Sequence, residues 1–221
     1  MKKVLFIILA SFMTFGTAQA VDMSFSVGVG MNQSVFAATG KEDNYDETGG
    51  AMITTEEYGA FEDTYPSAFV EVNLGDVLSI GASAQGDFST PTNINDAGSH
   101  STTAKSTVSV DFEQYFNAYV KVNVPLGGTY IRAGLSRVDI KTKETQGSGN
   151  SYPDTDTSGH MVAIGYQHET DAGIGIRAEI QGHVFDDVSV TNGVATTGNH
   201  NKITVSDMIG ATATLSVAKT F

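Results

Sequence analysis

The sequence predicts an all-β fold, an eight-stranded antiparallel up-and-down transmembrane β-barrel. Three observations predict it. Segments of about ten residues alternate apolar and polar side chains, the connections between them are alternately long and short, and an N-terminal export signal is combined with a C-terminal aromatic residue. Together these features are typical of chains that cross a membrane with strands.

Residues 1–20 are predicted to be a cleaved signal peptide. Lys2 and Lys3 precede an uncharged, apolar run from Val4 to Phe15, and a small-residue cleavage site ends at Ala20. The apolar run is shorter than the roughly 20 residues that a transmembrane helix needs. We therefore interpret the segment as an export signal rather than an uncleaved anchor, and residues 21–221 as the barrel domain.

The alternation has a period of two, as expected for strands that are apolar on one face. The predicted strands lie at about 22–32, 67–74, 77–87, 107–124, 131–136, 160–169, 174–184 and 209–221. In the fourth, we expect Phe112 and Phe116 to face lipid and Asp111 and Glu113 to face the lumen. In the fifth, this phase places Arg137 toward lipid, which predicts a β-bulge or emergence from the membrane at that point.

The connections alternate strictly between long and short. The short ones are at about 75–76, 125–128 and 170–173, and the long ones at about 33–66, 88–106, 141–159 and 186–203. Barrels of the outer membrane have short periplasmic turns and long extracellular loops. We therefore expect both termini in the periplasm and the long loops outside the cell. A soluble lipocalin-like barrel or sandwich is the alternative, but it would not require this alternation.

Charged side chains on the inward phase predict an ion-pair network across the lumen. Because an eight-stranded barrel is only wide enough for side chains to fill it, charges there must pair or meet water. The predicted network sets Lys121, Arg132 and Arg177 against Glu71 and Glu179. It is interpreted as a plug that stiffens the barrel, with a gate over a narrow polar path as the alternative.

The chain ends in a pattern that resembles the C-terminal signal of outer-membrane barrels. Phe221 is terminal, and Val217 and Leu215 precede it at alternate positions, although Lys219 interrupts the apolar series. The resemblance implies recognition by the barrel-assembly machinery during biogenesis. A Lys at the rim can extend to water.

The strand–turn–strand stretch from Tyr119 to Gly127, with Tyr130 to Gly134 after it, resembles OmpA-type and opacity-type outer-membrane barrel domains. The resemblance covers residues 21–221 in pattern and ends. It implies a role in membrane integrity, surface interaction or weak porin activity. The peptidoglycan-binding domain of full OmpA proteins is not expected here.

The amino-acid composition excludes some classes of partner and chemistry. A net charge of −13 argues against nucleic-acid binding, and the absence of Cys excludes thiol chemistry. We expect a monomer that contacts outer-membrane lipid or lipopolysaccharide and needs no cofactor. In the acidic first loop, Glu42, Asp43, Asp46 and Glu47 are candidates for holding a divalent cation, but their spacing is not that of an EF-hand, and a solvated loop is the simpler interpretation.

Enzymatic activity is not expected. Ser158 and His160 lie near the predicted outer rim, but lipid A deacylases order this pair as His-x-Ser, and no metal-ligand spacing is present. The sequence therefore predicts a small barrel of a Gram-negative outer membrane with a structural and surface-interaction role. A narrow porin for small hydrophilic solutes is the alternative, and a lipid A-modifying enzyme a remote one.

Overall fold

A computed structural model describes residues 22–45, 52–96, 105–145, 151–192 and 202–221, so the predicted signal peptide lies outside the described residues. The described chain is all β, and none of its segments is a helix that could cross a bilayer. Its strands are β1 (Met23–Tyr45), β2 (Met52–Leu74), β3 (Leu78–Gln85), β4 (Phe88–Ser89), β5 (Asn93–Asp96), β6 (Lys105–Asn123), β7 (Thr129–Thr145), β8 (Thr155–Glu169), β9 (Ile174–Phe185), β10 (Val188–Thr191) and β11 (Lys202–Thr220).

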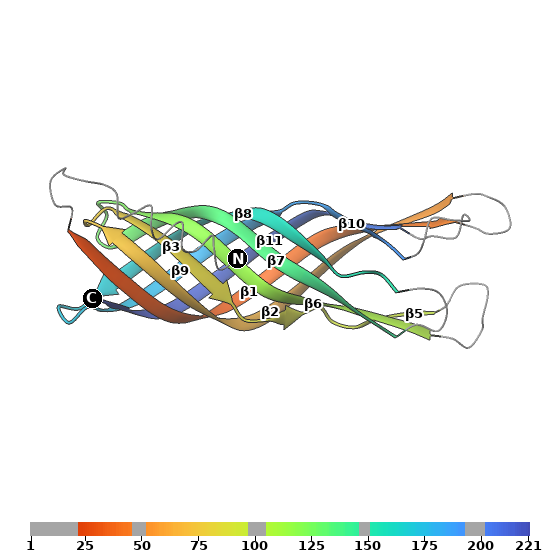
Figure 1. Cartoon of the computed structure of the whole chain (residues 1–221), viewed down its shortest axis with the longest axis horizontal. Helices are drawn as coiled ribbons and strands as arrows, with labels where there is room; N and C mark the ends of the chain where they lie inside the picture. Colours follow the sequence, from red (N-terminus) through yellow and green to blue (C-terminus); the bar gives the residue numbers. More distant parts are fainter. Residues whose placement is uncertain (1–21, 46–51, 97–104, 146–150, 193–201) are drawn as a thin grey trace, which may run out of the picture.

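Eight of these strands form a closed antiparallel ring (Figure 1). Its order is β1-β2-β3-β6-β7-β8-β9-β11, and β11 pairs with β1 from Ser26↔Thr220 onward to close it. The short strands β4, β5 and β10 add to β6 and β11 outside the ring. Within the closed part of the ring each strand is paired on both sides, which is what a strand in hydrocarbon requires. The predicted eight-stranded barrel is confirmed.

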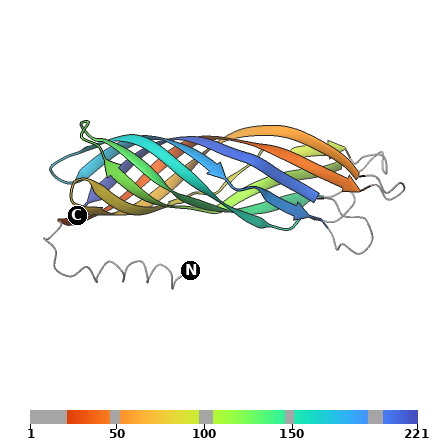
Figure 2. The same cartoon turned by 90° about the horizontal axis from the view of Figure 1, so that it is seen from above.

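The short turns lie together at one end of the barrel, which we call the short-turn end. Gly75, Gly127, Gly128 and Gly173 have positive φ in these turns, a conformation that glycine adopts without steric cost. The C-terminus lies at the same end (Figure 2), where Phe221 exchanges backbone hydrogen bonds with Phe25. The opposite end carries the long connections and is called the long-loop end.

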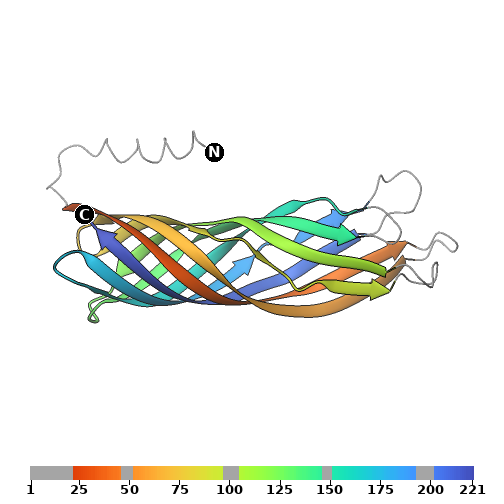
Figure 3. The same cartoon turned by 90° about the horizontal axis from the view of Figure 1, so that it is seen from below.

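Much of the chain that was expected to be loop is strand. The first predicted loop, 33–66, is a ladder that pairs β1 with β2 without a break as far as Tyr45↔Met52. The strands therefore continue beyond the closed ring and separate into two arms at the long-loop end (Figures 1 and 3). We call residues 39–45 and 54–64, with β10 and the adjoining part of β11, the acidic arm; β5 with the adjoining parts of β6 and β7 is the paired arm.

Two β-bulges change which side chains face inward, one at Gln114 on β6 and one at Asp207 on β11, where the register with β1 shifts. Gln114 has φ 51° and lies where the register between β6 and β7 shifts, so that two residues of β6 oppose one of β7. Above this bulge the phase of β6 reverses: Phe112 stacks on inward-facing rings, and Asp111 pairs with Lys143 at 3.5 Å. The prediction that Phe112 faces lipid and Asp111 the lumen was therefore wrong, because a bulge is invisible to a strict period of two.

The β7 strand itself stays regular through the position that the sequence left ambiguous. Val138 and Ile140 are buried, and Arg137, which directly precedes Val138, is exposed. Arg137 pairs instead with Asp156 on β8, at 3.3 Å. The bulge predicted for β7 lies on its neighbour, and the outward Arg marks the edge of the apolar outer surface.

Below this edge the outer surface of the ring is an apolar band. Alternate residues of the ring strands point outward there and most of them are exposed, whereas most of their inward neighbours are buried. Among them are Met23, Phe25, Val29, Met31, Val70, Val120, Val122, Ile131, Leu135, Val162, Ile164, Ile176, Ile180, Leu215 and Val217. On a soluble protein an apolar patch of this extent would be exceptional, whereas on a barrel it is the surface that faces lipid.

Candidate functional site in the barrel lumen

Buried charges fill the lumen near the short-turn end, and Glu71 is their centre. Its Oε2 accepts a hydrogen bond from Lys121 Nζ at 2.7 Å, and the Arg177 guanidinium binds both carboxylate oxygens at 2.8 Å. Tyr119 donates its hydroxyl to Oε1 at 3.0 Å. Strands β2, β6 and β9 each contribute an inward position, so one carboxylate joins three parts of the wall.

Arg132 and Glu179 form a second buried pair. Arg132 Nη2 donates to Glu179 Oε1 at 2.6 Å, and the guanidinium lies 4.2 Å from the centre of the Tyr119 ring. In the described structure Arg132 Nε has no hydrogen-bond partner. We call these five charged residues with Tyr119 and Tyr130 the charged layer. Residues 68–74 and 118–124 resemble each other in sequence, and Glu71 and Lys121 occupy equivalent positions in the two segments and carry opposite charge.

Small residues make room for the rings of this layer. A Cβ on Gly81 would lie 2.6 Å from the Tyr119 ring, and one on Gly165 would lie 2.3 Å from the Tyr130 ring. In both cases the tyrosine lies across from glycine on the adjacent strand. The glycines in β3 and β8 therefore decide how the tyrosines pack inside the barrel.

Hydroxyl groups and one histidine ring form hydrogen bonds in the lumen above the charged layer. Ser34 hydrogen-bonds Tyr65 at 2.7 Å and Thr212 at 2.8 Å. Higher up, the Tyr115 hydroxyl lies 2.9 Å from His183 Nδ1. These bonds satisfy polar groups that the narrow lumen shields from solvent.

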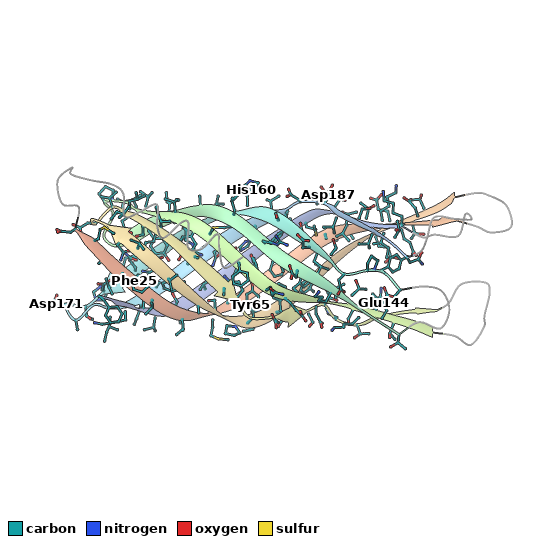
Figure 4. The ribbon with its side chains drawn as sticks, in the orientation of Figure 1. Phe25, Tyr65, Glu144, His160, Asp171 and Asp187 are labelled. Carbon is teal, nitrogen blue, oxygen red and sulfur yellow. The ribbon has the colours of Figure 1, made fainter. Side chains whose placement is uncertain are left out.

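An aromatic layer lies above these bonds, toward the long-loop end. Phe88 is central: it stacks on Phe36, Tyr65 and Phe112, with ring centroids 5.1, 4.6 and 4.9 Å away. Tyr65 lies between Asp171 at the short-turn end and Glu144 at the long-loop end (Figure 4). The members of this aromatic layer are Phe36, Phe61, Tyr65, Phe88, Phe112, Tyr115, Val138 and Phe185.

Sequence reasoning missed the aromatic layer. Phe61 and Tyr65 fall within the segment predicted to be the first long loop, 33–66, but they face inward on β2, whereas Tyr58 is exposed. The inward parity of Tyr65 continues that of Phe69 and Glu71, so extending the β2 alternation backward would have found it. Phe88 lies in a two-residue strand that is separated from β3, so no alternation in the sequence indicates that it faces inward.

The candidate cation-binding residues are only partly described. Asp43 accepts a hydrogen bond from Thr54 at 2.7 Å and pairs with Lys41 at 3.3 Å, and both interactions hold its pKa below the ordinary value. Glu42 is its neighbour on β1, while Asp46 and Glu47 lie outside the described residues. Within the described ranges, His, Asp and Glu side chains form no group that could hold a metal ion.

Ser158 and His160 do not form a catalytic pair. Both are exposed on the outward face of β8, and His160 points away from the barrel (Figure 4). Same-face neighbours on a strand are about 7 Å apart, and no hydrogen bond joins the two described side chains. A general base must reach its nucleophile, and this geometry does not provide that contact.

The residues of the predicted C-terminal signal lie on the outer wall. Leu215 and Val217 are exposed in the apolar band, and Phe221 follows the last pair of β11. Lys219, the departure from the pattern, donates from Nζ to the carbonyl of Ala172 and lies over the Phe221 ring. The ammonium is thus bound at the rim of the short-turn end rather than in the band.

Comparison with known families and structures finds a model described as outer membrane protein beta-barrel domain, which matches residues 7–209. No curated protein sequence matches. The crystal structure of the outer membrane protein OprG from Pseudomonas aeruginosa is similar, with a TM-score of 0.54, 13% identity, and coverage of 88% of this chain and 96% of that chain.

Two further solved structures are similar to different degrees. The solid-state NMR structure of the outer membrane protein AlkL in DMPC lipid bilayers has a TM-score of 0.50 at 14% identity, covering 93% of this chain and 94% of that one. The outer membrane protease OmpT from Escherichia coli has a TM-score of 0.42 at 8% identity, covering 94% and 100%. At these identities the likeness to OprG and AlkL concerns the fold alone, and that to OmpT carries no argument about activity.

Proposed function

This chain belongs to the outer membrane protein beta-barrel domain family, and we propose that it is a closed barrel of the outer membrane whose long-loop end acts in surface interaction. The observation that carries the proposal is the filling of the lumen by two successive layers. Buried ion pairs occupy the lumen near the short-turn end, and stacked rings occupy it above. With the lumen filled, the parts of this barrel that remain available to a partner are the arms at the long-loop end.

The orientation follows from the turns. Outer-membrane barrels place short turns in the periplasm and long connections outside the cell. On this basis the C-terminus and the turns at Gly75, Gly127 and Gly173 are periplasmic, and both arms extend into the medium. The acidic arm continues strands β1 and β2 by more than ten residues beyond the outward polar pair Gln33 and Thr64. Partners are therefore expected at the arms.

Cysteine labelling tests this orientation without background, because the chain has no cysteine. Tyr58→Cys on the acidic arm and Leu126→Cys in a short turn are matched sites, 72% and 71% exposed. On intact cells a membrane-impermeant maleimide should label Tyr58→Cys and leave Leu126→Cys unlabelled until the outer membrane is permeabilised. The reverse pattern would invert the proposed orientation.

Planar-bilayer recording tests whether the barrel is closed. The refolded protein should give no steady single-channel steps in a lipid bilayer. A narrow porin is the second candidate, because buried charges line part of the lumen and Arg132 Nε lacks a hydrogen-bond partner in the described structure. Steady steps that disappear in Arg132→Ala or Glu71→Ala would establish that candidate and overturn the closed barrel.

A further inference from the structure

The acidic arm ends in a strand edge that has no partner in the described chain. β2 pairs with β1 along its whole length, but its ladder with β3 covers only Ser67–Leu74. The next segments of the wall, β4 and β5, pair with β6 instead. From Thr54 to Thr64, one edge of β2 is therefore open within the described residues, over roughly 35 Å of extended chain.

The identity of the open backbone groups follows from one hydrogen bond. The carbonyl of Pro66 points toward β3, because it accepts from the amide of Gly86 at 2.7 Å. Alternate residues of a strand point their N–H and C=O groups to opposite edges. The open edge is therefore formed by the backbone groups of Glu62, Ala60, Tyr58 and Glu56, while the odd-numbered residues bond to β1.

The lower end of this edge is closed by a side chain. Asp63 accepts from its neighbour's amide, Thr64 N, at 2.6 Å and from Ser89 N at 3.3 Å. A carboxylate thus takes the place of a strand partner at the point where the ring opens. Above Asp63, the described residues offer no equivalent cap to the backbone from Glu56 to Glu62.

Charge selects the kind of strand that fits this edge. Between Thr54 and Thr64 the sequence carries four acids and no base, and Glu56, Glu57 and Glu62 are exposed. Antiparallel pairing of two copies centred on Gly59 would place Glu56 opposite Glu62, and like charges opposite each other are destabilising. The same acids that repel a second copy, a common protection of edge strands, attract a basic strand.

We propose that the open edge of β2, from Glu56 to Glu62, binds a basic extended peptide segment by strand addition. Backbone hydrogen bonds to the even-numbered residues hold the segment, and alternate Lys or Arg side chains lie beside Glu56 and Glu62 on the outer face. Tyr58, exposed between them, offers a ring to the same face. This inference rests on the proposed surface role, because an extracellular partner must reach the arm.

Fluorescence anisotropy tests the proposal with the full chain refolded in detergent, where orientation in a membrane has no influence. The probe is a labelled ten-residue peptide of alternating lysine and threonine. A peptide of the same sequence with alternate backbone N-methylation keeps the charge but loses the hydrogen bonds of one edge. We expect the N-methylated peptide to bind about tenfold more weakly or worse. Equal binding of the two peptides, or no binding of either, would overturn strand addition.

Matched variants separate the backbone contribution from the charge. Ala60→Pro removes an N–H of the open edge and leaves the β1 ladder intact, so it should weaken binding about tenfold, whereas Ala60→Val should change it less than about twofold. Glu56→Gln with Glu62→Gln should weaken binding about threefold to tenfold. Asp186→Asn with Asp187→Asn removes the same charge away from β2 and should leave binding unchanged.

Each outcome of these variants decides the proposal. Equal losses in the two charge pairs would show general electrostatic attraction and overturn a site on β2. Heat-modifiable gel mobility checks that each variant folds. If Ala60→Pro fails to fold, the comparison of the two peptides on the unaltered protein still decides the proposal. The cysteine-labelling result is independent of all of these, so failure of the surface role and failure of the β2 site are distinguishable.

Discussion

The charged layer and the aromatic layer fill the same lumen by opposite physical means. In the charged layer, stability depends on a complete set of partners, because each ion is shielded from water and is tolerable only while its counter-charge is in place. In the aromatic layer, stability depends on volume and contact, and any ring that keeps the space filled serves. Removing one side chain therefore has different consequences in the two layers.

The largest effect is expected where one carboxylate serves two cations. Glu71→Leu leaves Lys121 and Arg177 buried without a counter-charge, and we expect the free energy of unfolding to fall by about 4–5 kcal/mol. Urea unfolding of the refolded barrel, followed by circular dichroism because the chain has no Trp, measures it. Glu179→Leu is the matched control: it leaves only Arg132 without its counter-charge and should lower the free energy of unfolding by less. Equal losses of unfolding free energy in the two variants would contradict the conclusion that Glu71 is the centre of the charged layer.

A smaller loss is expected from the aromatic layer. Phe88→Ala removes the ring that stacks on Phe36, Tyr65 and Phe112, and should lower the free energy of unfolding by about 3 kcal/mol. Phe88→Leu keeps most of the volume and should cost about 1.5 kcal/mol or less. If both variants unfold like the unaltered protein, the rings of this layer are not a packed core.

The smallest effect is expected when the same kind of ion pair lies in water. On the paired arm, Lys141 Nζ donates to Asp154 at 3.1 Å and the Thr142 amide donates at 3.1 Å, and these bonds lower the pKa of Asp154 from its ordinary 3.8. Because the carboxyl pKa is lowered, the hydrogen bond that protects the Thr142 amide from exchange is present above pH 3.8 and is lost as the pH falls below it.

Hydrogen exchange at the Thr142 amide measures this loss. Protection should fall as the pH drops below 3.8, once the intrinsic exchange rate at each pH is divided out, while global unfolding in urea stays unchanged in Asp154→Asn at neutral pH. A large change in global stability would place this exposed pair on a par with the buried charges and contradict the comparison.

The bulge at Gln114 explains why a regular alternation predicted the ring but not the upper lumen. Val120, Val122 and Lys121 lie on the faces that a period of two assigns, because no bulge intervenes between them and the turn at Gly127. Phe112 lies beyond Gln114, where one extra residue reverses the phase. A bulge has no distinct composition here, since neither Gln114 nor Asp207 is glycine.

The sequence alone determined the closed, membrane-facing part of this protein. Hydrocarbon outside and a narrow lumen inside impose a strict alternation on each strand, and short turns need glycine, so both leave a local pattern in the chain. The charged residues Glu71, Lys121, Arg132, Arg177 and Glu179 were recognisable because they occupy the inward phase of that pattern, where a charge needs a partner.

The tertiary structure decided which charges meet, which rings stack and where the ring opens into arms. Glu71 and Arg177 are 106 residues apart in the chain, and their contact depends on how the strands are staggered around the barrel. The open edge of β2 likewise depends on β4 and β5 pairing with β6 rather than with β2. Pairing between strands is a property of the whole sheet, and no single strand's side-chain pattern encodes it.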